Sequence, residues 1–442
     1  MLRNDAIEIW KAGVSAVHGC TLVENSLHLA NDQLHLQDQT FNLNNFDRIL
    51  IVGGGKFSHF MAEGIENVLG PDVSKQKQLS GLVTVPDGSN EQDKLGFIES
   101  AQCRPAGVNL PTDRVLAATQ RMLDLLGNAD ERTLVLALIS GGGSALLENS
   151  PLPLADIIAA TNWLSSRGAN ILQLNTVRIA LSNIKGGGLA CQMPGGTLVG
   201  LIVSDVPNDD LRFVSSGPTV DFGDGLFSQA KEILESFGAT SESGFPKSAI
   251  EHIRNGSPQP CGQASVSNFL IGDANVARDA AIAKAQSLGY EVVLDTLAET
   301  ETCEQIADAV LKWCSESTSS KQCVISLGEP TVQPGESAGQ GGRNQHAVLT
   351  TIARMLDAKC TSKFCFMSAG TDGEDGNTPV AGAIMTDADI SKLANDALPI
   401  NESLGQFDSH NFLSANGLVF GSGPTATNVA DLRILLRQPP PT

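Results

Sequence analysis

The chain has 442 residues, which is more than one hydrophobic core usually serves, so two domains are expected. Its 29 basic and 49 acidic residues leave a net charge of −20, which opposes nucleic acid or an anionic membrane as a partner. The sequence has nine cysteines and no C-x-x-C pair, which predicts reduced thiols. Charged residues interrupt the first turns, and no apolar run approaches the ~18 residues of a membrane helix, so a cytoplasmic protein is expected. These features speak against a disulfide framework, a zinc site and a signal peptide.

A helix, a strand and a glycine turn open the chain. The spacing of apolar residues predicts an amphipathic helix within residues 5–30. Residues 48–52 read as a buried strand, and three glycines and Lys56 follow it directly before a helical stretch. Beside a glycine turn a lysine can reach a phosphate group, although a solvated helix start is the commoner role. A strand at 79–85 and a helix at 112–126 come next.

The stretch LVLALISGGGSALL contains a second glycine triplet. Residues 134–139 read as a fully buried strand, and the residues from Ala145 onward favour a helix. Backbone amides at Gly141 to Gly143 would then lie at a helix N-terminus, where an anion binds favourably. The alternative is a tight strand-to-helix turn without a ligand.

Cations and a carboxylate follow in the next segment. Arg178 and Lys185 are seven residues apart, so on one helix they would point the same way, and a third glycine triplet follows them. Solvated residues near a helix end are the alternative. A strand at 196–204 ends at Asp205, and the carboxyl ends of strands are where ligands bind in open α/β sheets. The alternative for Asp205 is a helix cap or a turn.

The second half alternates again. Ser, Gly and Pro at 241–267 indicate the passage between domains, which predicts domains at 1–255 and 256–442. Strands are expected at 266–271, 291–294, 323–327 and 364–368, and helices at 275–288, 302–314 and 346–356. Arg343 follows several glycines at a helix entrance, so it could grip a phosphate or carboxylate, or pair with a neighbouring acid. Residues 369–376 read as an acidic strand-end loop without the spacing of a calcium loop.

The ordered motifs resemble one known family. VGGGKFSHFMA, LISGGGSALL, NTVR, LSNIKGGGLA, LIVSDV, SSGPT, GQGGRNQ, SAGTDGEDG and SGPTATNV occur in the order seen in the glycerate 2-kinases of the MOFRL family, over residues 50–432. The resemblance implies an α/β fold with a Rossmann-like N-terminal domain, a smaller C-terminal α/β domain and an interdomain cleft. It also implies phosphorylation of the 2-hydroxyl of D-glycerate, or of a related small hydroxy acid, with ATP and Mg²⁺ as cofactors, and it allows a homodimer.

The resemblance also implies roles for particular residues. Lys56 and Arg343 would neutralise charge, Gly141 to Ser144 would cradle an anion, and strand-end carboxylates would face the metal or the nucleophile. The candidate catalytic residues are Lys56, Arg343 and Asp205; the candidate binding residues are Gly54, Gly55, Ser140, Gly141, Gly142, Gly143, Ser144, Arg178, Lys185, Gly342 and Asn344; and the candidate metal ligands are Asp205, Glu329 and Asp372.

The chain departs from the family pattern at several positions. Ile179 and Ala180 stand where relatives have Lys and His, Asn208 replaces a glycine, and Arg104 stands where relatives have the His of Gly-His-Pro. Losing a cation and an imidazole would cost ~2 to 4 kcal/mol of transition-state stabilisation if both were direct donors. Arg104 would restore one charge if it faces the same space. A hydroxypyruvate reductase and a non-catalytic protein that binds nucleotide or acid are the alternative functions.

Overall fold

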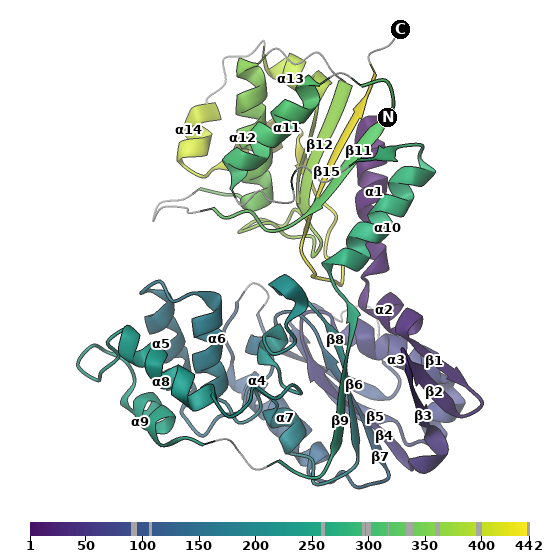
Figure 1. Cartoon of the computed structure of the whole chain (residues 1–442), viewed down its shortest axis with the longest axis vertical. Coiled ribbons are helices and arrows are strands. Elements are labelled where there is room, and N and C mark those ends of the chain that lie inside the picture. The colour runs from purple at the N-terminus through teal and green to yellow at the C-terminus, as the bar shows by residue number, and fades with distance from the viewer. Residues whose placement is uncertain are drawn as a thin grey trace. The chain divides into compact units, whose positions relative to one another are not determined.

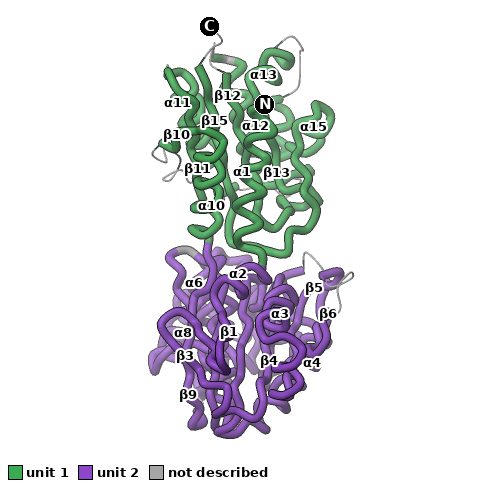
Figure 2. The backbone as a smooth tube through the Cα atoms, turned by 90° about the vertical axis from the view of Figure 1, so that its right-hand side faces the viewer, with its two compact units in different colours: residues 1–18, 274–442 green, residues 19–273 purple. Residues whose placement is uncertain are grey.

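The structure is a computed structural model that describes residues 1–89, 95–105, 108–257, 261–293, 297, 302–316, 318–332, 339–358, 363–394 and 400–439. The chain forms two compact units: unit 2 comprises residues 19–273, and unit 1 comprises residues 1–18 with 274–442 (Figure 2). No helix in the described ranges combines the length and the hydropathy that crossing a membrane requires.

Unit 2 is built on a six-stranded parallel sheet in the order β6-β5-β4-β7-β8-β9 (Figure 1). Its strands are β4 (Arg48–Gly54), β5 (Ser80–Pro86), β6 (Ile98–Arg104), β7 (Thr133–Ile139), β8 (Thr197–Val203) and β9 (Ser265–Gly272). The chain lays down β4, β5 and β6 in one direction and then returns to lay down β7, β8 and β9 in the other. This is the Rossmann strand order, and its switch point lies between β4 and β7. The predicted Rossmann-like fold is confirmed.

Helices cover this sheet because its strands are apolar on both faces. Strand β7 is buried at all seven positions, as a strand inside a parallel sheet requires. Side chains of α4 pack on one face together with residues of the loops that follow β7, and α3 contacts β4, β5 and β7. The helices near the sheet are α2 (Gly19–Ser26), α3 (Ser58–Gln76), α4 (Asp113–Leu126) and α7 (Gly188–Cys191), and the short helical turns are η1 (Leu43–Asn45), η2 (Gly143–Ala145), η3 (Pro207–Asp209) and η4 (Val214–Ser216).

Two smaller parts complete unit 2. Strands β1 (Leu27–Ala30), β2 (Gln33–Leu36) and β3 (Gln39–Asn42) form an antiparallel sheet. Helices α5 (Leu154–Ser165), α6 (Ile171–Ala180), α8 (Leu226–Ser236) and α9 (Lys247–Asn255) pack around their own apolar cluster, to the side of the main sheet (Figure 1).

Unit 1 is built on a mixed sheet in the order β10-β11-β15-β12-β13-β14, in which only β10 and β11 are parallel neighbours. Helices α1 and α10 pack together and contact strands of this sheet, and α11 and α12 share a second apolar cluster with it (Figure 1). The elements are α1 (Leu2–Ala16), α10 (Ala274–Ser287), β10 (Glu291–Val292), α11 (Cys303–Ser315), β11 (Gln322–Leu327), α12 (Arg343–Asp357), β12 (Lys363–Gly370), β13 (Gly382–Thr386), α13 (Asp387–Leu393), α14 (Ile400–Gly405), α15 (Ser409–Ala415), β14 (Val419–Phe420) and β15 (Asp431–Gln438).

The division of the chain differs from the predicted boundary at residue 255. The expected strand at 266–271 is β9, which pairs in parallel with β8 and therefore belongs to the first sheet. The expected passage at 241–267 contains α9. The predicted opening helix is two helices, and the first of them packs on α10 and β15 in unit 1. Contacts between segments far apart in the sequence decide which unit each of these elements belongs to, and local composition does not reveal such contacts.

The prediction that all cysteines are reduced is wrong. Cys191, at the end of α7, forms a disulfide with Cys261, 70 residues later. Pairing of β8 with β9 brings the two segments together, and the Gly262 N–H donates to the Cys191 carbonyl. The six other cysteines of the described residues are free: Cys20, Cys103, Cys303, Cys314, Cys323 and Cys365.

Candidate active site

Two glycine turns meet at the switch point of unit 2. Gly54 pairs with Ile139 in the sheet register, so the residues that follow them, Gly55 and Ser140, lie side by side. Gly55 has a φ of +155°, and a Cβ on it would fall 2.0 Å from the Ser140 Oγ. The Lys56 N–H donates to the Gly141 carbonyl at 2.8 Å. A side chain at residue 55 would therefore separate the two turns, which explains the glycine.

Asp205 joins this site from the carboxyl end of β8. A Cβ on Gly141 would lie 2.3 Å from Oδ2 of Asp205, so the carboxylate packs directly against the glycine backbone. Burial raises the pKa of the Asp205 carboxyl group, while its own backbone N–H, the Lys56 charge and the Gly142 N–H act in the opposite direction. The structure thus brings a lysine and a carboxylate from two distant segments to one place.

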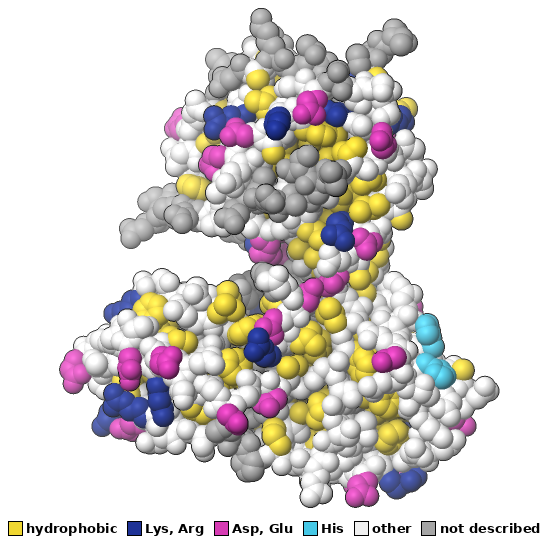
Figure 3. Space-filling model, in the orientation of Figure 1, with side chains coloured by type: hydrophobic (Ala, Val, Ile, Leu, Met, Phe, Trp, Pro, Cys, Tyr) yellow, Lys and Arg dark blue, Asp and Glu magenta, His cyan; other side chains and the backbone are white. Residues whose placement is uncertain are grey.

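A second cation lies beside Lys56. Gly142 has a φ of +79°, and a Cβ on it would lie 3.1 Å from Cγ of Lys56 and 3.6 Å from Nη2 of Arg104. Arg104 is the last residue of β6 and is 1% exposed. Arg104 therefore faces the same space as Lys56. On the face of the molecule drawn in Figure 3, acidic and basic side chains are interspersed.

The helix predicted after Ser140 is absent from the described residues 141–150. Gly143–Ala145 forms only a single turn of 3-10 helix. The Gly142 N–H is directed to Asp205 and the Gly143 N–H donates to the Ser140 carbonyl at 3.3 Å, so the protein itself uses both amides. Side chains rather than this turn must therefore supply most of the positive charge for an anion.

The segment SSGPT, residues 215–219, connects the glycine triplets. Ser215, Ser216 and Gly217 all have φ values in the left-handed region, at +51°, +63° and +60°. Two such serines in succession are strained and require support from their surroundings. The Ser215 Oγ donates to the Ser140 carbonyl at 2.6 Å, and the carbonyl of Ser216 accepts the Gly186 N–H at 2.9 Å. This loop holds the second and third triplets together, a role that its sequence did not reveal.

Arg178 and Lys185 do not lie on one helix. Helix α6 ends at Ala180, and Gly186 and Gly187 of the third triplet have left-handed φ values before α7 begins at Gly188. Lys185 is buried, donates to the Leu147 carbonyl at 3.0 Å and forms a buried ion pair with Glu148. Burial lowers the pKa of Arg178 and of Lys185, and Glu148 opposes both shifts. Lys185 is therefore held inside unit 2 by Glu148, a partner that the sequence analysis missed.

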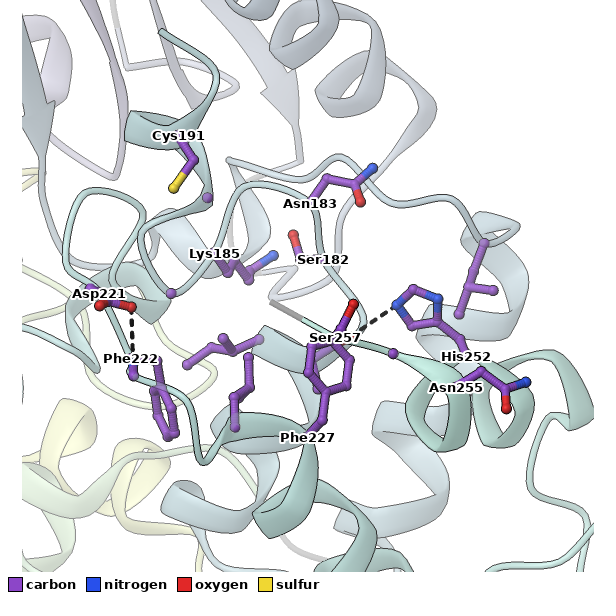
Figure 4. Close-up of a pocket in the computed structure, with 18 of the residues that line it drawn as sticks. Ser182, Asn183, Lys185, Cys191, Asp221, Phe222, Phe227, His252, Asn255 and Ser257 are labelled. Atoms are coloured by element: carbon purple, nitrogen blue, oxygen red, sulfur yellow. Dashed lines mark hydrogen bonds between the residues drawn. The ribbon is translucent and has the colours of Figure 1, made fainter. Parts of the chain in front are cut away.

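Lys185 also lines a cavity of about 610 Å³ (Figure 4). Figure 4 shows Lys185, Ser182 and Asn183 along the loop after α6, with Phe227 from α8 and His252 and Asn255 from α9 facing them. Both disulfide cysteines line the cavity.

In unit 1, Arg343 is the first residue of α12 and is held by two acids. Its Nε and Nη2 donate to the Asp431 carboxylate at 2.5 and 2.9 Å, and Nη2 lies 2.8 Å from Oε1 of Glu329. Burial lowers the pKa of Arg343, but the two carboxylates and Asp375 outweigh burial and hold the pKa above its usual range. The expected alternative, an arginine paired with neighbouring acids, describes this geometry.

Asp375 caps the same helix. Its carboxylate accepts the backbone N–H groups of Asn344 and Gln345 at 3.0 and 2.8 Å and also both side-chain amides. Burial raises the pKa of Asp375 to about 6 against these hydrogen bonds. A Cβ on Gly342 would lie 2.3 Å from Oδ1 of Asp375, which explains why a glycine precedes Arg343.

The candidate metal ligands fall in both units, Asp205 in unit 2 and Glu329 and Asp372 in unit 1. Asp372 accepts the Glu374 N–H at 3.1 Å, and Glu329 is paired with Arg343. Among the residues that the structure describes, no three His, Cys, Asp or Glu side chains are grouped as metal ligands. The metal assignment stays a prediction.

Comparison with known proteins decides the family. Residues 5–254 match a domain of unknown function, DUF4147, and residues 322–431 match the MOFRL family. The glycerate kinase of Danio rerio is 30% identical, in an alignment that covers 100% of this chain and 98% of that protein. The D-glycerate 2-kinase of Thermotoga maritima is 30% identical, in an alignment that covers 98% of each chain. The chain belongs to the MOFRL glycerate kinase family. A crystal structure of glycerate kinase from Thermotoga maritima matches 99% of both chains with a TM-score of 0.81 and 30% identity.

The geometry accounts for several departures of this MOFRL family member from the expected pattern. Asn208 has a φ of +62°, and asparagine tolerates the left-handed conformation that a glycine adopts, so the replacement keeps the turn. Ile179 and Ala180 are buried, and Ile179 lies so close to Gly186 that a Cβ there would be 2.5 Å from its Cγ2. Both positions are therefore filled by apolar packing.

Proposed function

We propose that the chain is a glycerate 2-kinase, which transfers the terminal phosphoryl group of ATP to the 2-hydroxyl of D-glycerate, or of a related small hydroxy acid, and yields 2-phosphoglycerate. The observation that carries the proposal is the convergence of Lys56, Gly141 and Asp205 at the Rossmann switch point. The full-length similarity to glycerate kinases supports it independently.

The proposed step needs a proton acceptor and positive charge. The hydroxyl oxygen of the acceptor bonds to the terminal phosphorus, the bond from that phosphorus to the bridging oxygen breaks, and ADP leaves. Asp205 receives the hydroxyl proton, and its raised pKa makes it a better base near neutral pH. Lys56 stabilises charge on the transferred group, because phosphoryl transfer depends mainly on positioning and neutralisation. The family resemblance implies a charge-neutralising role for Arg343 as well.

Magnesium fits the proposal by the chemistry of the donors. Carboxylate oxygens are the protein ligands that Mg²⁺ prefers. The candidates offer them separately, Asp205 in unit 2 and Glu329 and Asp372 in unit 1. When bound, the ion would neutralise charge on phosphate oxygens.

A coupled assay of ADP release with D-glycerate, L-glycerate, tartronate and glycolate tests the proposal. We expect the highest kcat/KM with D-glycerate. Lys56→Ala and Arg343→Ala should each abolish turnover, whereas Lys247→Ala, at an exposed ion pair of α9, should not change it. Oxidation of NADH with hydroxypyruvate would favour the reductase instead. Stabilisation by nucleotide without ADP release from any acid would favour a non-catalytic binding protein.

A further inference from the structure

Arg104 is a buried cation whose charge is not balanced within the described part of the chain. It is 1% exposed, and its Nη1 donates to the carbonyls of Pro105, at 3.3 Å, and Val108. Its Nε is buried without a hydrogen-bond partner among the described residues. Burying a charged group is costly unless an opposite charge meets it.

Asp87, whose charge acts on Arg104, is already engaged elsewhere. Asp87 acts on Arg104 only through its charge, while its carboxylate forms an ion pair with Arg114 at 2.8 Å. Arg104 itself forms no ion pair with any other residue in the described ranges. The backbone carbonyls that it contacts satisfy two hydrogens of the guanidinium, and no carboxylate among the described residues is paired with it.

The position of the guanidinium shows where an opposite charge would bind. Nη2 of Arg104 and the side chain of Lys56 approach the same face of Gly142, which carries no side chain to fill the space. An anion bound at this glycine would be attracted by both cations. Asp205 lies behind the neighbouring Gly141, so the groups proposed to act on the hydroxyl are one residue away.

We propose that Arg104 binds the carboxylate of the hydroxy-acid acceptor. This inference rests on the proposed function. In a 2-hydroxy acid the carboxylate and the reacting hydroxyl are on adjacent carbon atoms, so a residue that holds the carboxylate must lie beside the residues that act on the hydroxyl. Arg104 has that position relative to Lys56 and Asp205. Its planar fork can pair with both carboxylate oxygens, whereas a lysine offers only a point charge.

The test compares Arg104→Met and Arg104→Lys with the native chain. The control is Arg114→Met, which removes a neighbouring arginine whose side chain is 53% exposed and paired with Asp87. The KM for D-glycerate and for ATP, kcat, and the melting temperature are measured for each protein. A second acceptor, D-glyceramide, replaces the carboxylate with an uncharged amide and keeps the hydroxyl.

We expect Arg104→Met to raise the KM for D-glycerate by roughly 10- to 100-fold, the range for losing a hydrogen bond to a charged group. The KM for ATP should stay within about twofold, and the preference for D-glycerate over D-glyceramide should be lost to the same extent. Arg104→Lys should fall between the native chain and Arg104→Met, and Arg114→Met should leave all these values unchanged. A purely structural role would lower kcat or the melting temperature without changing the preference between acid and amide.

Three results would overturn the inference. An increase in the KM for ATP alone would place a phosphate at Arg104. An unchanged preference for acid over amide in Arg104→Met would mean that no carboxylate binds there. If Arg104→Met does not fold, an unchanged preference in Arg104→Lys, which loses the planar fork, rejects the inference instead. If no acid supports ADP release, the proposed function fails. Calorimetric titration with D-glycerate then tests Arg104 separately. Equal affinity of the native chain and of Arg104→Lys for D-glycerate, or no binding to either protein, rejects a carboxylate site at Arg104.

Discussion

Replacing Gly141 with alanine tests the position of Asp205 without touching a charged group. The new Cβ would lie 2.3 Å from Oδ2, 2.7 Å from Cγ and 3.2 Å from Cβ of Asp205. Ordinary contacts between such atoms are ~3.5 Å, so the carboxylate must recede by about 1 Å. Because the Cβ of Asp205 is also close, rotation of the side chain does not relieve the contact. A displacement of this size can lower a rate by ~100-fold, which corresponds to about 2.7 kcal/mol of activation free energy.

The matched control is Gly195→Ala, whose Cβ would meet its nearest neighbour at an ordinary 3.8 Å. Release of ADP with saturating D-glycerate gives kcat, and thermal unfolding reports the fold. Gly141→Ala should also lose ~1 to 3 kcal/mol of stability from overpacking, which lowers the melting temperature by a few degrees. If Gly141→Ala folds and keeps the native kcat/KM, then Asp205 does not act from the position described here.

Three further predictions concern buried charges. Arg343→Ala should lower the free energy of unfolding of unit 1 by about 3 to 5 kcal/mol, because Asp431, 2% exposed, loses its partner; an unchanged denaturation midpoint would contradict this. Glu148→Gln should destabilise unit 2 by a similar amount, since Lys185 stays buried, and denaturant titration of the variant checks it. The pKa of Asp375 rises from 3.8 to about 6 on folding, so the native state holds the proton more tightly than the unfolded state. The contribution of Asp375 to stability is therefore complete below pH 3.8, and about 3 kcal/mol of it is lost as the pH rises through 6. Asp375→Asn should flatten this pH dependence of the free energy of unfolding, measured from pH 3 to 7.

Local patterns predicted most of the secondary structure around the site. The alternation of apolar strands with glycine turns located β4, β7 and β8 to within a residue or two, because burial and backbone torsions depend on neighbouring residues. The same reasoning was wrong where a helix was inferred from helix-forming residues alone, as after Ser140, since hydrogen bonds from the turn to Asp205 compete with a longer helix. It was also wrong for the cysteines, because the partner of Cys191 arrives through the pairing of β9.

The sequence by itself determined the Rossmann-like alternation, the glycine turns and the family, since ordered motifs carry that information without a third dimension. Only the tertiary structure decided that Asp205, Lys56 and Arg104 meet around Gly141 and Gly142, and that Lys185 and Arg343 are tied to Glu148 and Asp431. The physical reason is that the ligand or partner of a charged side chain depends on strand order and register, which join segments separated by 37 to more than 100 residues.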